Sequence, residues 1–205
     1  MKVLLIHGQG RTWLSMLLLG WRLKRQGYAV CYFRYMTWLE SFDKITHRFV
    51  QTLGAKMGDQ LYVIIGHSLG NIITRSSLPR LTCSPPRHLI MLAPPNQPPL
   101  LGKIFKSNLI YRLFTKDCGQ KVADDAFYGQ LPCPTIPTTI IAGTRGLPKF
   151  LSPFAGEPND MILAVSETRL EGLAEPVLVR ASHPFIMNSK QVVEIIYSVL
   201  ERETY

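Results

Sequence analysis

A serine between two glycines is the first feature of this sequence that could do chemistry. Ser68 is the centre of a G-H-S-L-G motif at residues 66–70, between an apolar run and a helical pattern. A serine in a G-x-S-x-G motif between a strand and a helix lies on a sharp turn that holds its hydroxyl above the sheet. The flanking glycines relieve crowding at such a turn. We therefore expect Ser68 to act as a nucleophile on a carbonyl carbon.

A general base is needed next, because a serine hydroxyl is a poor nucleophile until an imidazole takes its proton. Of the five histidines, His183 is the one expected just past the carboxyl end of a strand, on the side of the sheet where Ser68 must lie. The others are expected in the first turn, in mid-helix, beside the serine but facing away, and at the wrong end of a strand: His7, His47, His67 and His88. His183 is therefore the predicted base.

A carboxylate must orient that imidazole. In the chain order that accompanies a G-x-S-x-G turn, the acid comes between the serine and the histidine, here after the strand expected at 138–143. The first carboxylates after this strand are Glu157 and Asp160. Asp160 lies in a turn-forming stretch before an apolar segment, which favours it, and Glu157 stays the alternative.

Acyl transfer also needs two N–H donors that face the developing oxyanion. The turn itself supplies one of them, the backbone N–H of Leu69. The second should come from a turn at the carboxyl end of a neighbouring strand, and the H-G-Q-G stretch at residues 7–10 follows the first expected strand. Its glycines let the backbone bend inward. We therefore predict the backbone N–H of Gln9 as the second donor.

Six short apolar runs, rich in branched and aromatic residues, are the expected strands that position these groups. Because they are apolar throughout, they are typical of parallel strands buried on both faces. The runs are residues 2–7, 29–34, 61–66, 88–93, 138–143 and 177–181. Helical patterns fall between them or after them, at 13–25, 42–56, 69–81 and 191–202. The sequence predicts an α/β fold with about six mostly parallel strands flanked by helices, and a ligand site at their carboxyl ends.

The stretch between the fourth and fifth strands, residues 94–137, is much longer than an ordinary crossover. It opens with a proline-rich stop and continues into a helical pattern whose apolar side chains largely face away from its lysines and arginines. We expect a single domain over residues 1–205 in which 94–137 is an insertion. Its part at 98–115 is expected to pack on the core, to line the acyl site as a lid, or to lie at a membrane interface.

Composition sets limits on the partners. The chain has 205 residues, 46% of them hydrophobic, and a formal net charge of +9. This charge is typical of a scattered basic surface that aids solubility, and an anionic membrane surface is the alternative partner. The basic residues are too dispersed to indicate nucleic acid. The four cysteines form no C-x-x-C pair, so no metal site or disulfide framework is expected. Without a recognisable targeting or membrane-spanning segment, we expect a cytoplasmic protein, with peripheral attachment to the membrane as an option.

These motifs together resemble the α/β-hydrolase superfamily, and more closely its small bacterial lipases and esterases. The resemblance rests on residues 7–10 (H-G-Q-G), 66–70 (G-H-S-L-G), 92–96 (L-A-P-P-N), 159–162 (N-D-M-I), 167–172 (E-T-R-L-E-G) and 182–185 (S-H-P-F). It implies a minimal form of that fold, with Ser68, Asp160 and His183 as a catalytic triad and Gln9 and Leu69 as oxyanion donors. Two positions depart from the pattern, since Asn71 and Met161 stand where many relatives have glycine.

The expected function is hydrolysis of a carboxylic ester with an apolar acyl chain, through an acyl-enzyme and without a cofactor or a metal. The substrate would be a small-molecule or lipid ester. A thioesterase or another acyl hydrolase would use the same triad, and the sequence does not separate these activities. A second class of function is a membrane- or lipid-binding module that retains the fold with a misaligned triad.

Overall fold

One parallel sheet forms the centre of the molecule. The computed structural model describes residues 1–204, except for the side chain of Lys149. Its six strands lie in the order β2-β1-β3-β4-β5-β6, and every neighbouring pair is parallel. They are β1 (Lys2–Ile6), β2 (Ala29–Phe33), β3 (Tyr62–His67), β4 (His88–Leu92), β5 (Thr138–Gly143) and β6 (Val177–Val179). The predicted fold class is confirmed, and all six apolar runs contain a strand.

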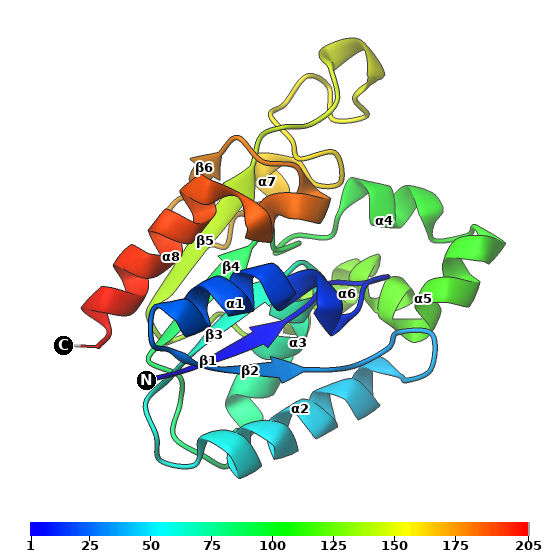
Figure 1. Ribbon diagram of the computed structural model, residues 1–205. Helices are drawn as coiled ribbons and strands as arrows, with labels where there is room; N and C mark the ends of the chain where they lie inside the picture. The colour runs from blue at the N-terminus through cyan, green and yellow to red at the C-terminus, as the bar shows by residue number, and fades with distance from the viewer. Residues whose placement is uncertain (205) are drawn as a thin grey trace.

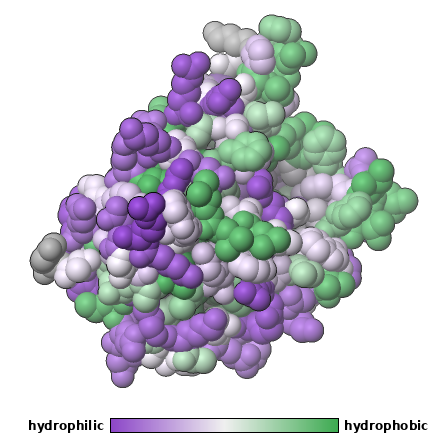
Figure 2. Space-filling model, in the orientation of Figure 1, coloured by the Kyte–Doolittle hydropathy of each residue, from purple (hydrophilic) through white to green (hydrophobic). Residues whose placement is uncertain are grey.

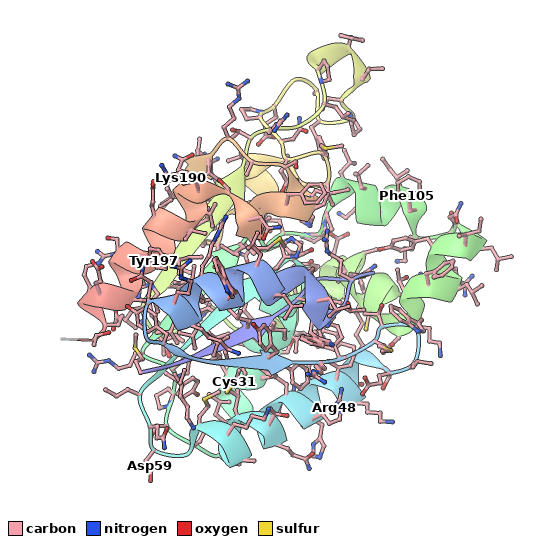
Figure 3. The ribbon with its side chains drawn as sticks, viewed as in Figure 1. Cys31, Arg48, Asp59, Phe105, Lys190 and Tyr197 are labelled. Atoms are coloured by element: carbon pink, nitrogen blue, oxygen red, sulfur yellow. The ribbon has the colours of Figure 1, made fainter. Side chains whose placement is uncertain are left out.

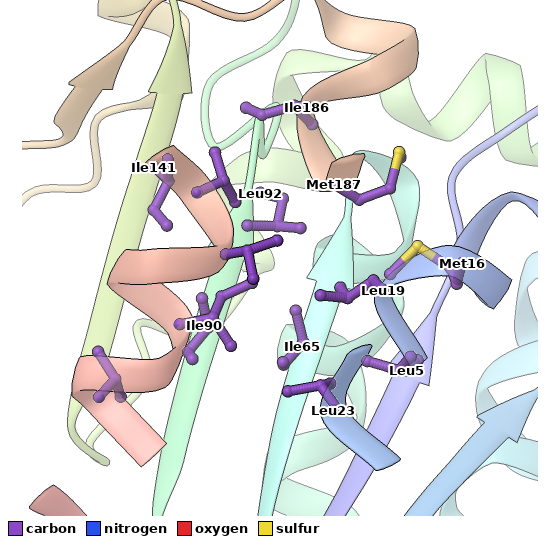
Figure 4. Close-up of a cluster of buried hydrophobic side chains, with 14 of the residues drawn as sticks. Leu5, Met16, Leu19, Leu23, Ile65, Ile90, Leu92, Ile141, Ile186 and Met187 are labelled. Carbon is purple, nitrogen blue, oxygen red and sulfur yellow. The ribbon is translucent and has the colours of Figure 1, made fainter. Parts of the chain in front are cut away.

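Helices cover both faces of this sheet (Figure 1). Because side chains alternate along a strand, Val3 and Leu5 of β1 pack on one face while Leu4 and Ile6 pack on the other. The first face is covered by α1 (Leu17–Arg25) and α8 (Lys190–Arg202), and Figure 4 shows the buried cluster beneath them. The second face is covered by α2 (Phe42–Met57) and α3 (Leu69–Ser77). The two layers fix the strands, and with them the loops at their carboxyl ends.

Element ends differ from the predicted ones where local chemistry intervenes. The helix expected at 13–25 begins as a 3₁₀ turn, η1 (Trp13–Met16). The helix expected at 69–81 ends at Ser77 and is followed by the 3₁₀ turn η2 (Leu78–Arg80), because Pro79 has no N–H to continue it. The last strand stops at Val179, since Ala181 N–H turns back to the Val179 carbonyl. The chain then enters another 3₁₀ segment, η4 (His183–Asn188).

The insertion forms three short helices at the carboxyl edge of the sheet, α4 (Leu100–Phe105), α5 (Leu109–Val122) and α6 (Asp125–Gln130). The single helical pattern predicted there is divided after Phe105, because the Asn108 side chain caps α5 by accepting from Tyr111 N–H. Inside α5, Lys116 has φ 46° and ψ −136°, which kinks the helix. After β5 the chain passes through η3 (Lys149–Leu151) and α7 (Val165–Thr168).

Two polar contacts attach this insertion to the start of α2. Phe42 N–H donates to the Asp117 carboxylate at 2.8 Å, and Lys121 pairs with Asp43 at 3.1 Å. The second half of α5 is buried at Cys118 and Val122, whereas the first half projects outward. Figure 3 shows Phe105 on α4 at the outer rim of this insertion. The insertion therefore packs on the core through one half and is exposed through the other.

Candidate active site

Ser68 lies on a strained turn between β3 and α3. It has φ 49° and ψ −122°, a backbone conformation that non-glycine residues seldom adopt, and its N–H donates to the Leu92 carbonyl of β4 at 3.0 Å. A Cβ added at Gly70 would come within 2.7 Å of the His7 carbonyl oxygen. The second glycine of the motif is therefore required by the close approach of the turn to β1, and the serine is held in a strained conformation common at functional sites.

Asn71, which stands in place of the glycine that the resemblance leads us to expect, stabilises this turn. Its side-chain nitrogen lies 3.2 Å from the Ser68 carbonyl oxygen and 3.3 Å from the Leu92 carbonyl oxygen, and it donates to both. The side chain is fully buried and fills the space next to Gly66, where a Cβ would come within 2.2 Å of its oxygen. The asparagine thus ties the turn to β4, which a glycine at this position could not do.

His183 and Asp160 form a buried pair. Nδ1 of His183 lies 2.8 Å from Oδ2 of Asp160, and the other carboxylate oxygen accepts from the N–H groups of Ile162 and Leu163 at 3.0 and 2.8 Å. The His183 N–H also donates to the Asp160 carbonyl at 2.8 Å. When Nδ1–H of a neutral His183 donates this hydrogen bond to the Asp160 carboxylate, Nε2 is the basic nitrogen. This is the arrangement that a general base requires.

Glu157, the alternative acid, bonds Ser166 instead of His183. Its two carboxylate oxygens accept from the N–H and the hydroxyl of Ser166, at 2.7 and 3.0 Å. Ser166 belongs to the first turn of α7, so the carboxylate satisfies the start of that helix. The structure brings Asp160 to His183, while Glu157 serves α7.

Ser68 and His183 line one pocket of about 370 Å³ at the carboxyl edge of the sheet. Its volume is within the range of small-molecule sites. Gln9 and Arg11 lie on the β1 side, and the walls are mainly apolar: Leu101, Phe105, Val122, Ile162 and Leu163. The insertion and the loop after β5 thus both contribute to the walls, and a bound ligand would meet apolar side chains above a polar floor.

The two predicted oxyanion donors lie beside this floor. Gln9 follows β1 in a turn and lines the pocket, and its side chain contacts the Tyr111 hydroxyl of α5 at 3.4 Å. Leu69 is the first residue of α3, where a backbone N–H has no acceptor within the helix. A Cβ at Gly8 would lie 2.9 Å from the Ser68 Cβ, so the turn approaches the serine closely because residue 8 is glycine.

His67 has a contact that the sequence did not indicate. Its Nε2 lies 3.0 Å from the main-chain oxygen of His183, and because that oxygen only accepts, Nε2 carries the proton. Burial, followed by the electrostatic effect of His183, holds the pKa of His67 well below its usual range. The neutral His67 ring therefore connects the turn of Ser68 to the His183 main chain. Hydrogen bonds hold His183 at both main-chain groups, its N–H to Asp160 and its carbonyl to His67.

The other histidines lie elsewhere. His7 stacks on Tyr35, with ring centroids 4.1 Å apart, and burial lowers its pKa to about 4. His88 bonds Glu203 and Thr139, and the exposed His47 contacts Gln51. Within the described residues, no group of three or more histidine, cysteine, aspartate or glutamate side chains could hold a metal ion. Across residues 1–204, no helix has the length and apolar character needed to cross a membrane.

Comparison with known proteins places the fold. No protein-family model and no curated protein sequence matches the chain. The structure is similar to the mature lipase BlEst2 of Bacillus licheniformis, with a TM-score of 0.76 and 13% identity over 97% of this chain and 91% of that one. It is also similar to an extracellular alpha/beta-hydrolase of a Paenibacillus species, with a TM-score of 0.63 and 13% identity over 97% and 98% of the two chains.

A third similar structure is the phospholipase PlaB of Legionella pneumophila. The TM-score is 0.63 with 21% identity, and the match covers 82% of this chain but 45% of the phospholipase. At these identities the likeness concerns the fold. The chain has the α/β-hydrolase fold, as its motifs led us to expect.

Proposed function

We propose that this protein is a serine hydrolase that cleaves carboxylic esters through an acyl-enzyme. The observation that carries the proposal is that Ser68 and His183 line the same pocket, while Asp160 bonds Nδ1 of His183 and so leaves Nε2 as its basic nitrogen. Ser68 is the nucleophile, His183 the base and Asp160 the carboxylate that orients it. The lipase and alpha/beta-hydrolase structures of the same fold support this assignment.

The steps follow from these positions. The Ser68 hydroxyl attacks the ester carbonyl while Nε2 of His183 accepts its proton, and the backbone N–H groups of Gln9 and Leu69 stabilise the oxyanion. His183 then returns the proton to the leaving alcohol, and the acyl group remains on Ser68. A water molecule then attacks the acyl-enzyme while His183 accepts its proton, and His183 returns that proton to the Ser68 oxygen as the bond to the acyl group breaks and the acid is released. These steps use the chain's own side chains and need neither cofactor nor metal.

The walls of the pocket indicate an apolar acyl chain. Leu101, Phe105 and Val122 come from the insertion, and Ile162 and Leu163 come from the loop that holds Asp160. Burial of an acyl chain against them would remove apolar surface from water on both partners. A small-molecule or lipid ester is therefore the proposed substrate.

We propose that the protein encounters a lipid ester at an anionic membrane surface. The exposed half of the insertion is apolar and basic, with Leu109 and Leu113 exposed and Arg112 between them. The cytoplasm is the proposed compartment, which agrees with the four cysteines, Cys31, Cys83, Cys118 and Cys133, all of which have free thiols.

A panel of p-nitrophenyl esters of rising acyl length tests the activity, with matched thioesters of the same acyl chains beside it. We expect turnover that rises with chain length until the pocket is filled, and loss of turnover in Ser68→Ala. Faster turnover of the thioesters than of the oxygen esters would assign the same site to a thioesterase. Turnover of neither series by the folded protein would contradict the proposal and favour a binding module.

A further inference from the structure

Two exposed apolar segments follow the carboxyl ends of β4 and β5. The first, called here the insertion ridge, is residues 100–114 of α4 and α5. The second, called the β5 loop, is residues 144–154 and contains η3. Each segment exposes large apolar side chains, up to 78% of Leu109 in the ridge and 85% of Phe150 in the loop. The others are Leu100, Ile104, Phe105, Ile110, Leu113 and Phe114 in the ridge and Leu147 and Leu151 in the loop.

The ridge lines the pocket through Leu101, Phe105 and Tyr111, whereas the β5 loop contacts the loop that holds Asp160, where Leu147 N–H donates to the Asn159 side chain at 3.2 Å. In Figure 1 the β5 loop projects at the top of the molecule and the ridge, which includes α4, projects at the right. Figure 2 shows hydrophobic side chains gathered on both projections. The rim between them is also apolar, because Phe185 of η4 is 63% exposed and Ile162 of the Asp160 loop is half exposed. Large apolar side chains are therefore exposed on the ridge, on the β5 loop and on the two loops that carry Phe185 and Ile162.

The charges on these segments have one sign. The ridge contains Lys103, Lys106 and Arg112, the β5 loop contains Arg145 and Lys149, and neither segment contains an aspartate or glutamate. Lys103 pairs with Asp125 outside the ridge at 2.6 Å. Arg11, which lines the pocket, lies 6.0 Å from the Phe185 ring. A partner for this face must therefore have an apolar interior beneath a negatively charged surface. A second copy of a chain with a net charge of +9 would instead be repelled.

We infer that the insertion ridge and the β5 loop dock together on an anionic lipid bilayer, so that the pocket mouth faces the membrane. The apolar side chains enter the acyl region, while the lysines and arginines meet the headgroups. Contacts through two separate segments hold the molecule in one orientation, which the ridge alone would not do. The inference rests on the proposed function, because a docked pocket would receive a lipid ester directly from the bilayer.

Sedimentation with vesicles tests this face, using phosphatidylcholine alone and a mixture of phosphatidylcholine with phosphatidylserine. The variants are Phe150→Ser in the loop and Leu113→Ser in the ridge, neither of which lines the pocket. Leu61→Ser is the matched control, because Leu61 is 54% exposed just before β3, at the opposite edge of the sheet. We expect wild type to bind the mixed vesicles well above the neutral ones, about tenfold weaker binding for each test variant, and no change for the control.

Three results would overturn the inference: absence of wild-type binding to the mixed vesicles, binding of both test variants at the wild-type level, or an equal loss in Leu61→Ser. A wild-type dimer in light scattering that Phe150→Ser dissociates would assign the face to a second copy instead. Binding is also measured with Ser68→Ala, which should dock like wild type. Turnover of a soluble ester without vesicles reports the activity separately, so failure of the docking face and failure of the proposed function are distinguished.

Discussion

Two regions around the pocket are built in different ways: the floor, which holds Ser68, Asp160 and His183, and the roof, which is the first half of α5. In the floor, Ser68, Asp160 and His183 are positioned by hydrogen bonds to the main chain of β4 and of the loops beside it, and Asp160 and His183 are almost fully buried. In the roof, the first half of α5 exposes most of its large side chains. The sheet therefore fixes the positions of the proposed triad residues, whereas the first half of α5 is largely exposed to solvent.

Two polar contacts join the first half of α5 to the loops after β1 and β2, whereas the short contacts of Asp117 and Lys121 attach its second half to α2. The Gln9 side chain reaches the Tyr111 hydroxyl at 3.4 Å, and Thr37 reaches the Phe114 carbonyl at the same distance. Both contacts are long for hydrogen bonds, so they are weak. A change in the first half of α5 should therefore leave Ser68, Asp160 and His183 in place and, in the proposed hydrolase, alter the choice of substrate. The predictions below separate the two regions, from the largest expected effect to the smallest.

The largest effect is expected in the floor, for Asp160→Asn. An asparagine can offer its own N–H to Nδ1 of His183 and so favour the wrong tautomer, which should lower kcat/KM about 10³- to 10⁴-fold. Ester turnover measures it, with Glu157→Gln as the matched control, because Glu157 bonds Ser166 and should change the rate only a few-fold. Equal losses in the two variants would remove Asp160 from the assigned role.

The same leucine-to-alanine change should affect stability very differently in the two regions. Leu5 of β1 is 1% exposed within the core, so Leu5→Ala should lower the free energy of unfolding by about 2–5 kcal/mol. Leu113 of the roof is 67% exposed, and Leu113→Ala should lower it by less than about 0.5 kcal/mol. Urea unfolding of both variants checks this contrast. A loss at Leu113 as large as that at Leu5 would mean that the roof is part of the core.

Low pH should lower the free energy of unfolding through His7, which lies next to the floor. Its pKa is lowered to about 4 by burial, while the unfolded chain has the ordinary value of about 6.5, so the unfolded state binds more protons between these values. The stability that a neutral His7 provides is complete above about pH 6.5 and is lost as the pH falls toward 4. At pH 5 the loss is about 2 kcal/mol relative to pH 7.

Urea unfolding at pH 7 and pH 5 measures this loss, with His7→Phe as the variant that keeps a ring against Tyr35 and does not titrate. The drop in stability between the two pH values should be smaller in His7→Phe by about the amount assigned to the histidine. Glu167 acts in the opposite direction, since burial raises its pKa, and it is present in both proteins. An equal drop in wild type and variant would exclude His7 as its source.

The smallest effect is expected for the hydrogen bond from His67 to the His183 carbonyl. His67→Met removes the donor to the His183 carbonyl and should lower kcat about tenfold with little change in KM, because the base becomes less well positioned. His67→Gln keeps an N–H donor near the same place and should recover most of the rate. Steady-state kinetics and thermal unfolding of both variants provide the test. If the glutamine variant is as slow as the methionine variant at equal stability, the bond does not position His183.

The floor could be predicted closely from the sequence, for a physical reason. Parallel strands buried on both faces are read as continuous apolar runs, and the loops at their carboxyl ends meet at one edge. The sequence alone therefore predicts Ser68, Gln9 and His183 at this edge of the sheet, and all three line the pocket. The choice between Asp160 and Glu157 needed the structure, because both follow β5 and only the fold of the loop shows which carboxylate reaches His183.

The roof was predicted less well, because helical periodicity carries no information on where a helix is interrupted. The stripe of apolar residues continues through residues 101–114, yet the chain is divided after Phe105. A signal was present in Asn108, a preferred N-cap residue. The kink at Lys116 had no such signal, and the bond from His67 to His183 depends on a ring direction that spacing does not specify.

Covalent labelling of Ser68 tests the central claim most directly. Folded wild-type protein is treated with a fluorophosphonate, digested and examined by mass spectrometry, with Ser68→Ala and Asp160→Asn treated alongside. We predict one adduct on the peptide that contains Ser68, none in Ser68→Ala, and a labelling rate lowered by orders of magnitude in Asp160→Asn. Folded wild-type protein without an adduct, or with its adduct on another serine, would contradict the account.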